Sequence, residues 1–376
     1  MVTHIKEESI SFDSKNTFYN PEMRFCRSFF SLAVGALEGK LKLLDAFCAS
    51  GIRGIRYAKE NKNVKEITFL DLSKNAITAS KKNTKTNKLK AKFVNDKIEK
   101  FCTVFLDYDF VEIDPFGTPV PYLNDIMRSQ NDKKEWFLSV SATDTAVLCG
   151  PQATACLKNY HSKSLNNEFT HEVGTRIFIK RVAEAAAEHN FGITPLISLS
   201  DRHYIKLLLK VVRGADASDD TIKQLGFVSY CNICGWRTYG KRMKNSCEQC
   251  KCETDYGGQL WLGELHDKKL LQKMLKLNEK RNYTDAKELE KKLQLLIGEL
   301  DMPAFYYNVH LLCKKVKSAS VPKIDDFIKK IEARGTLQVA SRQSIARRTH
   351  FSDVSIKSDA GVKELKKAIL SKKQVI

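Results

Sequence analysis

The sequence lacks the features that would direct it out of the cell or into a membrane. Its first residues contain no apolar core of a signal peptide. Its longest apolar runs, such as residues 29–37, are too short and too interrupted to cross a bilayer. Long repeats and low-complexity segments do not stand out either. We therefore expect a cytoplasmic protein with no membrane partner.

Acidic residues are scarce relative to basic ones. The 376 residues include 63 Lys and Arg against 44 Asp and Glu, which gives a formal net charge of +19. This surplus favours a polyanionic partner, with nucleic acid ahead of a membrane surface. The contents of 43% apolar and 28% charged residues are those of an ordinary globular protein, long enough for two domains. No obligate protein partner is evident.

Most of the sequence is also poor in cysteine, because five of the eleven lie between residues 231 and 252. Cys231 and Cys234 form one Cys-x-x-Cys pair, and Cys247 and Cys250 form another after twelve intervening residues. Two such pairs complete a tetrahedral site for one structural Zn²⁺, which we expect to hold a ribbon-like module at about residues 228–258. Cys252 is a spare that could replace Cys250. A redox dithiol is the competing interpretation, and the paired motifs argue against it.

Apolar runs alternate with amphipathic stretches through the first 213 residues. The runs predict strands at residues 42–47, 66–70, 91–95, 110–113, 136–142, 193–199 and 204–212. The last two are separated by a hairpin-sized link, so we expect them to be antiparallel. Strands alternating with helices and ending in such a pair predict a doubly wound α/β sheet with one reversed strand. This architecture resembles that of class I methyltransferases.

Acidic residues stand at the ends of four successive predicted strands: Asp45, Asp71, Asp96 and Asp114. Open α/β sheets bind ligands at the carboxyl ends of their strands. Small residues around Gly51 follow the first acid, without the Gly-x-Gly-x-x-Gly spacing of dinucleotide sites. This pattern resembles the first motif of S-adenosylmethionine-dependent methyltransferases. Asp71 is placed to bind ribose hydroxyls and Asp96 to accept from an adenine amine, although helix capping or solvation would also explain either acid alone.

The stretch from Glu112 to Pro119 follows the fourth of these strands with an exposed turn, since two prolines and a glycine stop the strand. Asp114 offers an acceptor for an amine N–H, and Phe116 offers a flat stacking surface. This combination suits group transfer to an amino group on an aromatic ring. The alternative is a proline-terminated strand whose acid caps the next helix.

The composition changes after residue 265 to lysine-rich amphipathic stretches, which predict helices at residues 268–278, 285–300, 309–317 and 323–334. A serine- and proline-containing turn and a basic tail suggest a winged-helix-like module. The candidate phosphate contacts in it are Arg342, Arg347, Arg348 and His350. We expect a catalytic domain over residues 1–265 and a mainly helical RNA-binding domain over residues 266–376.

Together these stretches resemble the tRNA (guanine-26-N2)-dimethyltransferase family, in its archaeal form. The motifs that carry the resemblance are Phe18-Tyr19-Asn20-Pro21, Ser50-Gly51-Ile52-Arg53-Gly54-Ile55-Arg56, Asp114-Pro115-Phe116-Gly117-Thr118-Pro119, Thr143-Asp144 with Leu148-Cys149-Gly150, His171-Glu172-Val173-Gly174-Thr175-Arg176 and Arg348-Thr349-His350-Phe351. The resemblance implies S-adenosylmethionine as methyl donor and N2 of guanine 26 in tRNA as acceptor.

The resemblance also implies roles for individual residues. The implied donor-binding residues are Arg27, Asp45, Gly51, Arg53, Asp71 and Asp96. The implied catalytic residues are Asp114, Phe116 and Phe18, with the acid accepting hydrogen bonds from the target amine and the two rings sandwiching the guanine. Lys97 stands where relatives tend to have a small residue, and the zinc cysteines are not universal in the family.

Two alternative functions are compatible with these patterns. The chain could methylate another exocyclic amine, such as adenine N6 or guanine N2 of ribosomal RNA; the single proline before Phe116-Gly117 argues against adenine. It could also be a non-catalytic RNA-binding module on a degenerate methyltransferase fold. The intact acids at all four strand ends argue against that reading.

Overall fold

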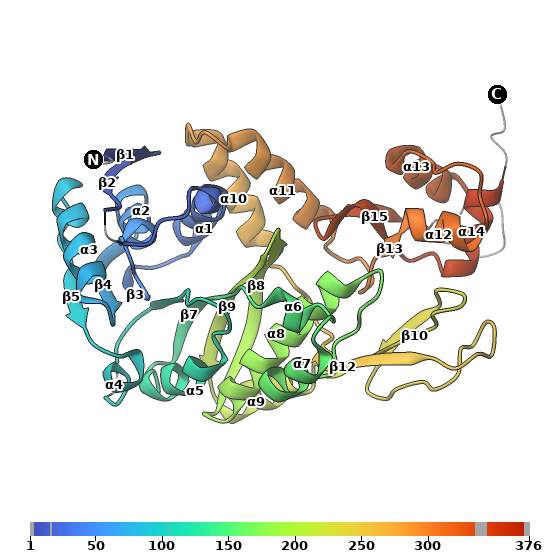
Figure 1. The fold of residues 1–376 in the computed structure, drawn as a ribbon, viewed down its shortest axis with the longest axis horizontal. Coiled ribbons are helices and arrows are strands. Elements are labelled where there is room, and N and C mark those ends of the chain that lie inside the picture. Colours follow the sequence, from blue (N-terminus) through green and yellow to red (C-terminus); the bar gives the residue numbers. More distant parts are fainter. Residues whose placement is uncertain (1–3, 16, 105, 335–343, 372–376) are drawn as a thin grey trace.

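The computed structural model describes residues 4–15, 17–104, 106–334 and 344–371 (Figure 1). A seven-stranded sheet forms its centre, in the order β5-β4-β3-β6-β7-β9-β8. The strands are β3 (Leu41–Ala46), β4 (Val64–Asp71), β5 (Lys92–Asn95), β6 (Phe110–Ile113), β7 (Glu135–Ala142), β8 (Phe191–Asp201) and β9 (Tyr204–Arg213). All neighbours pair in parallel except β9, which is antiparallel to both β7 and β8. The predicted doubly wound sheet with one reversed strand is confirmed.

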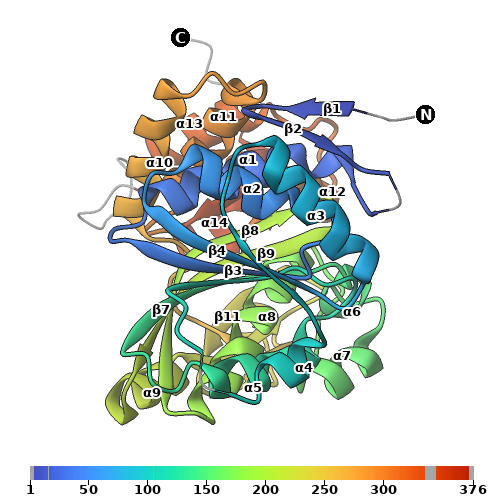
Figure 2. The ribbon, with the colours of Figure 1, turned by 90° about the vertical axis from the view of Figure 1, so that its left-hand side faces the viewer.

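Helices cover both faces of this sheet (Figure 2). One face carries α1 (Arg24–Ala36), α2 (Ile52–Glu60) and α3 (Lys74–Thr86). The other carries α4 (Ile98–Phe101), α5 (Val120–Ser129), α6 (Thr145–Leu148), α7 (Ala153–Tyr160) and α8 (Thr170–Ala187), with α9 (Ala215–Ile222) beside β8. The period of two along a strand divides the two cores, since Leu43 of β3 packs into the first core and Leu44 into the second.

A short N-terminal hairpin, β1 (His4–Glu7) and β2 (Ile10–Asp13), packs against this layer, and a 3₁₀ turn, Pro21–Met23, leads into α1. The side chain of Asn83 in α3 accepts from the backbone N–H of Asp13 and donates to its carbonyl. The sequence predicted no strands before residue 20. The hairpin matters because it brings the carboxylate of Glu7 against α1 and α2.

Two helices that follow residue 265, α10 (Lys268–Lys280) and α11 (Ala286–Gly298), pack on α1. Their buried side chains, including Leu271 and Leu293, share one core with Phe29 of α1. Helix α1 is buried on nearly all sides, so the sheet alone does not cover it. The predicted domain boundary at residue 265 therefore does not coincide with a change in packing, and the first core extends to about residue 300.

The remaining elements form a smaller unit at one end of the molecule (Figure 1). A three-stranded ribbon consists of β10 (Leu225–Tyr230), β11 (Arg237–Gly240) and β12 (Asp255–Trp261). A second small sheet contains β13 (Tyr307–Asn308), β14 (Ala346–Thr349) and β15 (Ser352–Ser358), with helices α12 (Val309–Lys315), α13 (Ile324–Arg334) and α14 (Val362–Leu370). Trp236 of the ribbon and Leu312 of α12 lie in the same core. The ribbon thus packs with the C-terminal unit, whose order of strand, two helices and hairpin matches the winged-helix-like prediction.

The candidate phosphate-binding residues of this unit have different positions. Arg347 and Arg348 are partly exposed and pair with Glu332 and Asp325. His350 is buried against Glu299, so its assignment to a phosphate contact was wrong. Arg342 lies outside the described residues. Within those residues, no helix has both the length and the apolar character needed to span a bilayer.

Candidate active site

A cavity of about 250 Å³ lies where β3, β4 and β6 end. Seven of the predicted site residues line it: Phe18, Arg27, Asp45, Arg53, Asp71, Asp114 and Phe116. Gly51 and Asp96 are not among the lining residues. The carboxyl edge of the parallel sheet therefore brings together three of the four strand-end acids, as expected for an open α/β fold.

The turn after β3 shapes the floor of this cavity. Gly51 has a φ of 75°, and a Cβ there would approach the Cβ of Ser80 to 2.9 Å, so the position requires glycine. The carboxylate of Asp71 accepts a 2.9 Å hydrogen bond from the backbone N–H of Ala49 in the same turn. Gly51 thus shapes the turn without lining the cavity, while Asp71 joins the turn to the end of β4.

Asp96 points to other partners. Its carboxylate accepts from the N–H of Lys97 at 2.9 Å and pairs with Lys100 at 3.0 Å. Those two contacts lower its pKa. Its predicted contact with an adenine amine stays a prediction.

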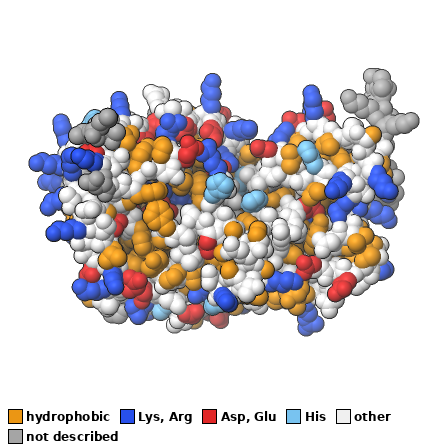
Figure 3. Space-filling model, in the orientation of Figure 1, with side chains coloured by type: hydrophobic (Ala, Val, Ile, Leu, Met, Phe, Trp, Pro, Cys, Tyr) orange, Lys and Arg blue, Asp and Glu red, His pale blue; other side chains and the backbone are white. Residues whose placement is uncertain are grey.

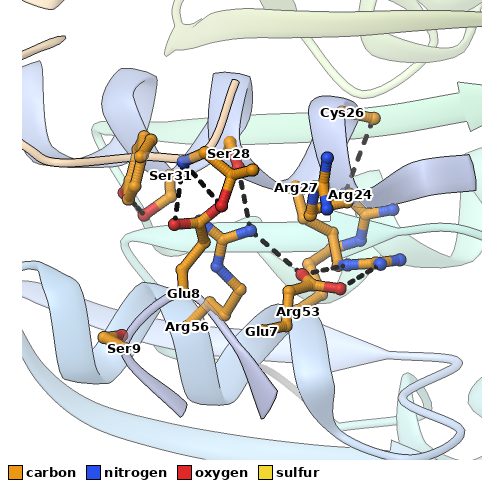
Figure 4. Close-up of polar contacts among 12 residues, drawn as sticks. Glu7, Glu8, Ser9, Arg24, Cys26, Arg27, Ser28, Ser31, Arg53 and Arg56 are labelled. Carbon is orange, nitrogen blue, oxygen red and sulfur yellow. Dashed lines mark hydrogen bonds and ion pairs between the residues drawn. The ribbon is translucent and has the colours of Figure 1, made fainter. Parts of the chain in front are cut away.

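Arg27 is held from below by Glu7, as Figure 4 shows. Its Nε and Nη2 donate to the two oxygens of Glu7 at 2.8 and 2.5 Å, and Arg56 Nη1 donates to the same carboxylate at 3.0 Å. The hydroxyl of Tyr19 donates to it as well. Burial would raise the pKa of Glu7, but the two arginines outweigh burial and lower it. The sequence analysis missed Glu7, since a lone acid in a polar N-terminal stretch carries no local signal.

Asp114 lies in a network of buried charges. Its Oδ2 accepts from Arg53 Nη2 at 2.5 Å, and Arg53 Nε lies 3.7 Å from Glu112 Oε1. Lys206 of β9 contacts the same Glu112 oxygen and donates to Ser141 Oγ at 2.9 Å. Burial would raise the pKa of Asp114, yet the positive charges of Arg53 and Lys206 prevail and lower it to about 2. The side chain is 23% exposed, so an ionised acceptor faces the cavity.

Asp45 lies in the opposite electrostatic environment. It is 2% exposed, and its Oδ2 accepts from the N–H of Gly54 at 3.0 Å. Burial and the nearby charge of Glu112 raise its pKa to about 8. The two acids of the same cavity, Asp45 and Asp114, therefore have different protonation states at neutral pH.

Two exposed aromatic rings stand at the rim. Phe18 is 53% exposed and Phe116 is 78% exposed, and their rings meet edge to face with centroids 4.8 Å apart. The N–H of Gly117 donates to Thr143 Oγ1 at 2.8 Å, which holds the loop that carries Phe116. The rings touch each other, so a base can enter between them only after they separate. The predicted sandwich of the guanine stays a prediction.

The four predicted metal-ligating cysteines also converge. The sulfur atoms of Cys231, Cys234, Cys247 and Cys250 all lie within 4.8 Å of one another, with two pairs at 3.4 Å. A tetrahedral Zn²⁺ with bonds of about 2.3 Å would hold its sulfurs about 3.8 Å apart, so this group fits the ion. Cys252 is outside the group, because its thiol donates to the carbonyl of Cys250.

The basic side chains gather at both ends of the long axis, over α3 and over the smaller unit (Figure 3). Apolar side chains lie on the same face of the molecule between them.

Comparisons with known proteins agree over almost the whole chain. Residues 2–370 match the family of N2,N2-dimethylguanosine tRNA methyltransferases. The chain is 32% identical to the tRNA (guanine(26)-N(2))-dimethyltransferase of Methanobrevibacter smithii, covering 96% of this chain and 93% of that relative. It is 35% identical to the tRNA (guanine(26)-N(2)/guanine(27)-N(2))-dimethyltransferase of Aquifex aeolicus, over 82% of this chain and 81% of that one. The structure of Trm1 from Pyrococcus horikoshii in complex with S-adenosyl-L-methionine superposes with a TM-score of 0.86 at 28% identity, over 98% of this chain and 100% of that chain.

Proposed function

Because the chain belongs to the N2,N2-dimethylguanosine tRNA methyltransferase family, we propose that it methylates the exocyclic N2 of guanine 26 in tRNA. S-adenosylmethionine is the donor, and the products are N2-methyl- and N2,N2-dimethylguanosine. The observation that carries this proposal is the cavity at the strand ends, where an ionised Asp114 lies beneath two exposed aromatic rings.

The donor fits the inner part of the cavity by its chemistry. Asp71 presents a carboxylate at the end of β4, where ribose hydroxyls bind in such folds. Arg27 presents a fixed guanidinium, and a carboxylate is its natural partner. The bound donor supplies an electrophilic methyl group on a sulfonium.

Asp114 acts on the acceptor, which is a poor nucleophile. The lone pair of a guanine amine is delocalised into the ring. A carboxylate that accepts the amine N–H draws the nitrogen toward tetrahedral geometry and directs its lone pair at the methyl group. Arg53 and Lys206 keep Asp114 ionised for this role.

The rim aromatics serve the approach of the base. Guanine 26 must leave its stack to reach the cavity, at a cost of roughly a few kcal/mol. Stacking on a ring such as that of Phe116 contributes about 1–3 kcal/mol and offsets part of that cost. The basic ends of the molecule supply sequence-independent attraction for the tRNA backbone. With tRNA as substrate, a cytoplasmic location stays our prediction.

A variant of Asp114 tests the proposal. Asp114→Asn keeps the size of the side chain but removes the charged acceptor, and we expect methyl transfer to fall about 10²- to 10⁴-fold. The assay is radiolabelled methyl incorporation into unmodified tRNA, with nucleoside mass spectrometry to count methyl groups. Donor binding, measured by calorimetry, should persist. Asp107→Asn is the matched control, since Asp107 is exposed ahead of β6. Normal transfer by Asp114→Asn would remove Asp114 from this role.

We also propose that the four cysteines hold one structural Zn²⁺. Four thiolates leave no open position, so the ion would fix the ribbon without taking part in the reaction. The backbone amides of Cys250 and Gln249 outweigh burial and lower the pKa of Cys247 to about 7, which favours the thiolate that a metal requires. Metal analysis should find about one zinc per chain. Cys250→Ser should lose it and Cys252→Ser should keep it; the reverse pattern would contradict the assignment.

A further inference from the structure

The buried charges below the cavity do not balance. Five charged side chains meet there, which we call the cavity cluster: Asp45, Glu112, Asp114, Arg53 and Lys206. Asp45, Glu112, Arg53 and Lys206 are buried, and Asp114 is only partly exposed. The cluster therefore contains three carboxylates and two cations.

Both cations are committed to other carboxylates, those of Glu112 in β6 and of Asp114 just after its end. Arg53 contacts Asp114 at 2.5 Å and Glu112 at 3.7 Å, and Lys206 contacts Glu112. Asp45 lies directly opposite Glu112 in the register of β3 and β6, which places two acids side by side. Over the described ranges, Asp45 forms no ion pair within 4.0 Å. Asp45 is thus the carboxylate left without a cation.

The other elements around Asp45 do not supply one. The further titratable groups that line the cavity with it are Tyr19, Arg27 of α1, Asp71 of β4 and Cys48 of its own turn. Arg27 is already paired with Glu7. Asp71 adds a negative charge, while Tyr19 and Cys48 are neutral, because burial raises the pKa of each above its usual value. The charged side chains around the cavity therefore have a surplus of negative charge.

A buried carboxylate without a partner takes up a proton to avoid the cost of desolvating its charge. This agrees with the pKa of Asp45, which burial and Glu112 raise to about 8. S-adenosylmethionine carries one more positive charge than its demethylated product, namely the sulfonium. The donor therefore brings the third cation that the cavity cluster lacks, and the product does not.

We propose that Asp45 determines the preference of the pocket for the charged donor over the neutral product, an inference that rests on the proposed function. Asp45 releases its proton when the donor binds and is protonated again after transfer. In the transfer step the N–CH₃ bond forms as the S–CH₃ bond breaks and the bonding pair stays on sulfur; the one proton that the amine loses balances the proton that Asp45 takes up. The positive charge of the donor disappears while Asp45 gains a proton, so the net charge of the pocket is unchanged. Asp45 thus binds the donor as an anion and leaves the product without an ionic partner, which favours its release.

Calorimetry on the full-length protein without RNA tests this proposal. S-adenosylmethionine and S-adenosylhomocysteine are titrated between about pH 6 and 7, where ligand α-amino groups with pKa values of about 7.7–8.0 are already protonated. Parallel titrations in phosphate and in imidazole, which differ in ionisation enthalpy, count the protons released. We expect about one proton released per donor and none per product. We also expect donor affinity to rise about tenfold for each pH unit while product affinity stays flat.

Asp45→Asn assigns the effect to this residue. The amide oxygen can still accept from the N–H of Gly54, so the turn keeps its hydrogen bond. We expect this variant to bind the donor without proton release and with no pH dependence of the donor-to-product affinity ratio. Asp107→Asn is the control and should behave as wild type. A folded Asp45→Asn protein that still releases a proton would overturn the proposal.

If circular dichroism shows that Asp45→Asn does not fold, the wild-type comparison decides alone. Equal proton counts for donor and product in the wild type would overturn the proposal, even while methyl transfer to tRNA leaves the proposed function intact. Absence of both donor binding and methyl transfer would instead contradict the proposed function itself.

Discussion

Two buried charge clusters in this molecule differ in their balance. The cavity cluster contains three carboxylates and two cations. The second, which we call the junction cluster, joins Glu172 of α8 and Glu299 after α11 to Arg176, Lys357 and His350. Glu172 contacts Arg176 at 2.9 Å and Lys357 at 2.8 Å, and Glu299 contacts His350 at 2.8 Å and Lys357 at 3.7 Å. Each carboxylate in the junction cluster thus has cationic or hydrogen-bonding partners.

The ratio of carboxylates to cations in each cluster agrees with the position of that cluster in the fold. In the junction cluster, burial would raise the pKa of Glu299, but His350 and Lys357 lower it to about 2, and the pKa of Glu172 is lowered by Lys357 and Arg176 in the same way. Its residues come from the sheet helix α8, from the end of α11 and from the smaller unit, so matched charges join these three parts. The unmatched cluster lies at a cavity. In our proposal, the buried carboxylate without a cation is the one that a charged ligand pairs with.

Breaking the balanced cluster should have the largest effect on stability. Glu172→Gln removes the negative charge shared by Arg176 and Lys357 and leaves both cations buried. We expect a loss of about 3–5 kcal/mol in the free energy of unfolding. Urea denaturation at pH 7, followed by circular dichroism, measures it. A loss below about 1 kcal/mol would show that the junction cluster does not hold the units together.

Removing a cation from the unbalanced cluster should cost less, because its carboxylates can take up a proton instead. For Lys206→Met we expect a loss of about 1–3 kcal/mol at pH 6. The folded variant then holds a proton that the unfolded chain has lost, so its free energy of unfolding should fall further between pH 6 and 8. The pKa of Asp114 should rise, which moves the acid limb of the transfer profile to higher pH.

Lys210→Met is the matched control for that variant, since Lys210 lies on the same strand and pairs with Glu135 at the surface. Unfolding curves at pH 6, 7 and 8 and the pH profile of methyl transfer provide the two measurements. If the free energy of unfolding changed with pH in the same way in Lys206→Met and in wild type, the result would contradict the expectation that a carboxylate of the cavity cluster takes up a proton when a cation is removed.

The smallest effect is expected from a pair at the surface. Arg348 and Asp325 form an ion pair at 2.8 Å, with side chains 39% and 69% exposed. Asp325→Ala should change the free energy of unfolding by only about 0–1 kcal/mol, and less at high salt. If Asp325→Ala lowered the free energy of unfolding as much as Glu172→Gln does, burial would not explain why the junction cluster contributes more to stability than a surface pair.

Local patterns predicted the seven strands of the central sheet, four of the helices after residue 265 and the site acids at the strand ends. Asp45, Asp71 and Asp114 converge because the carboxyl ends of parallel strands meet at one edge. The cysteine pairs converge because each pair forms a short turn. Both outcomes follow from spacing along the chain.

Charge partners that are distant in sequence could not be predicted in this way. Lys206 meets Glu112 across 94 positions, and Lys357 meets Glu172 across 185. No periodicity connects such residues, because only the completed fold brings them together. The pattern of α10 and α11 likewise predicted two amphipathic helices but not the helix that their apolar faces cover. The sequence therefore contained no sign that the core of the first helices extends past residue 265.

The packing of α10 and α11 on α1 also sets the order in which the protein can mature during synthesis. Domains fold as units as the chain leaves the ribosome, the N-terminal part first. Here the first core cannot close until the segment to about residue 300 has emerged, since that segment covers α1. Helix α1 must therefore wait with one apolar surface exposed to water until that segment has been made.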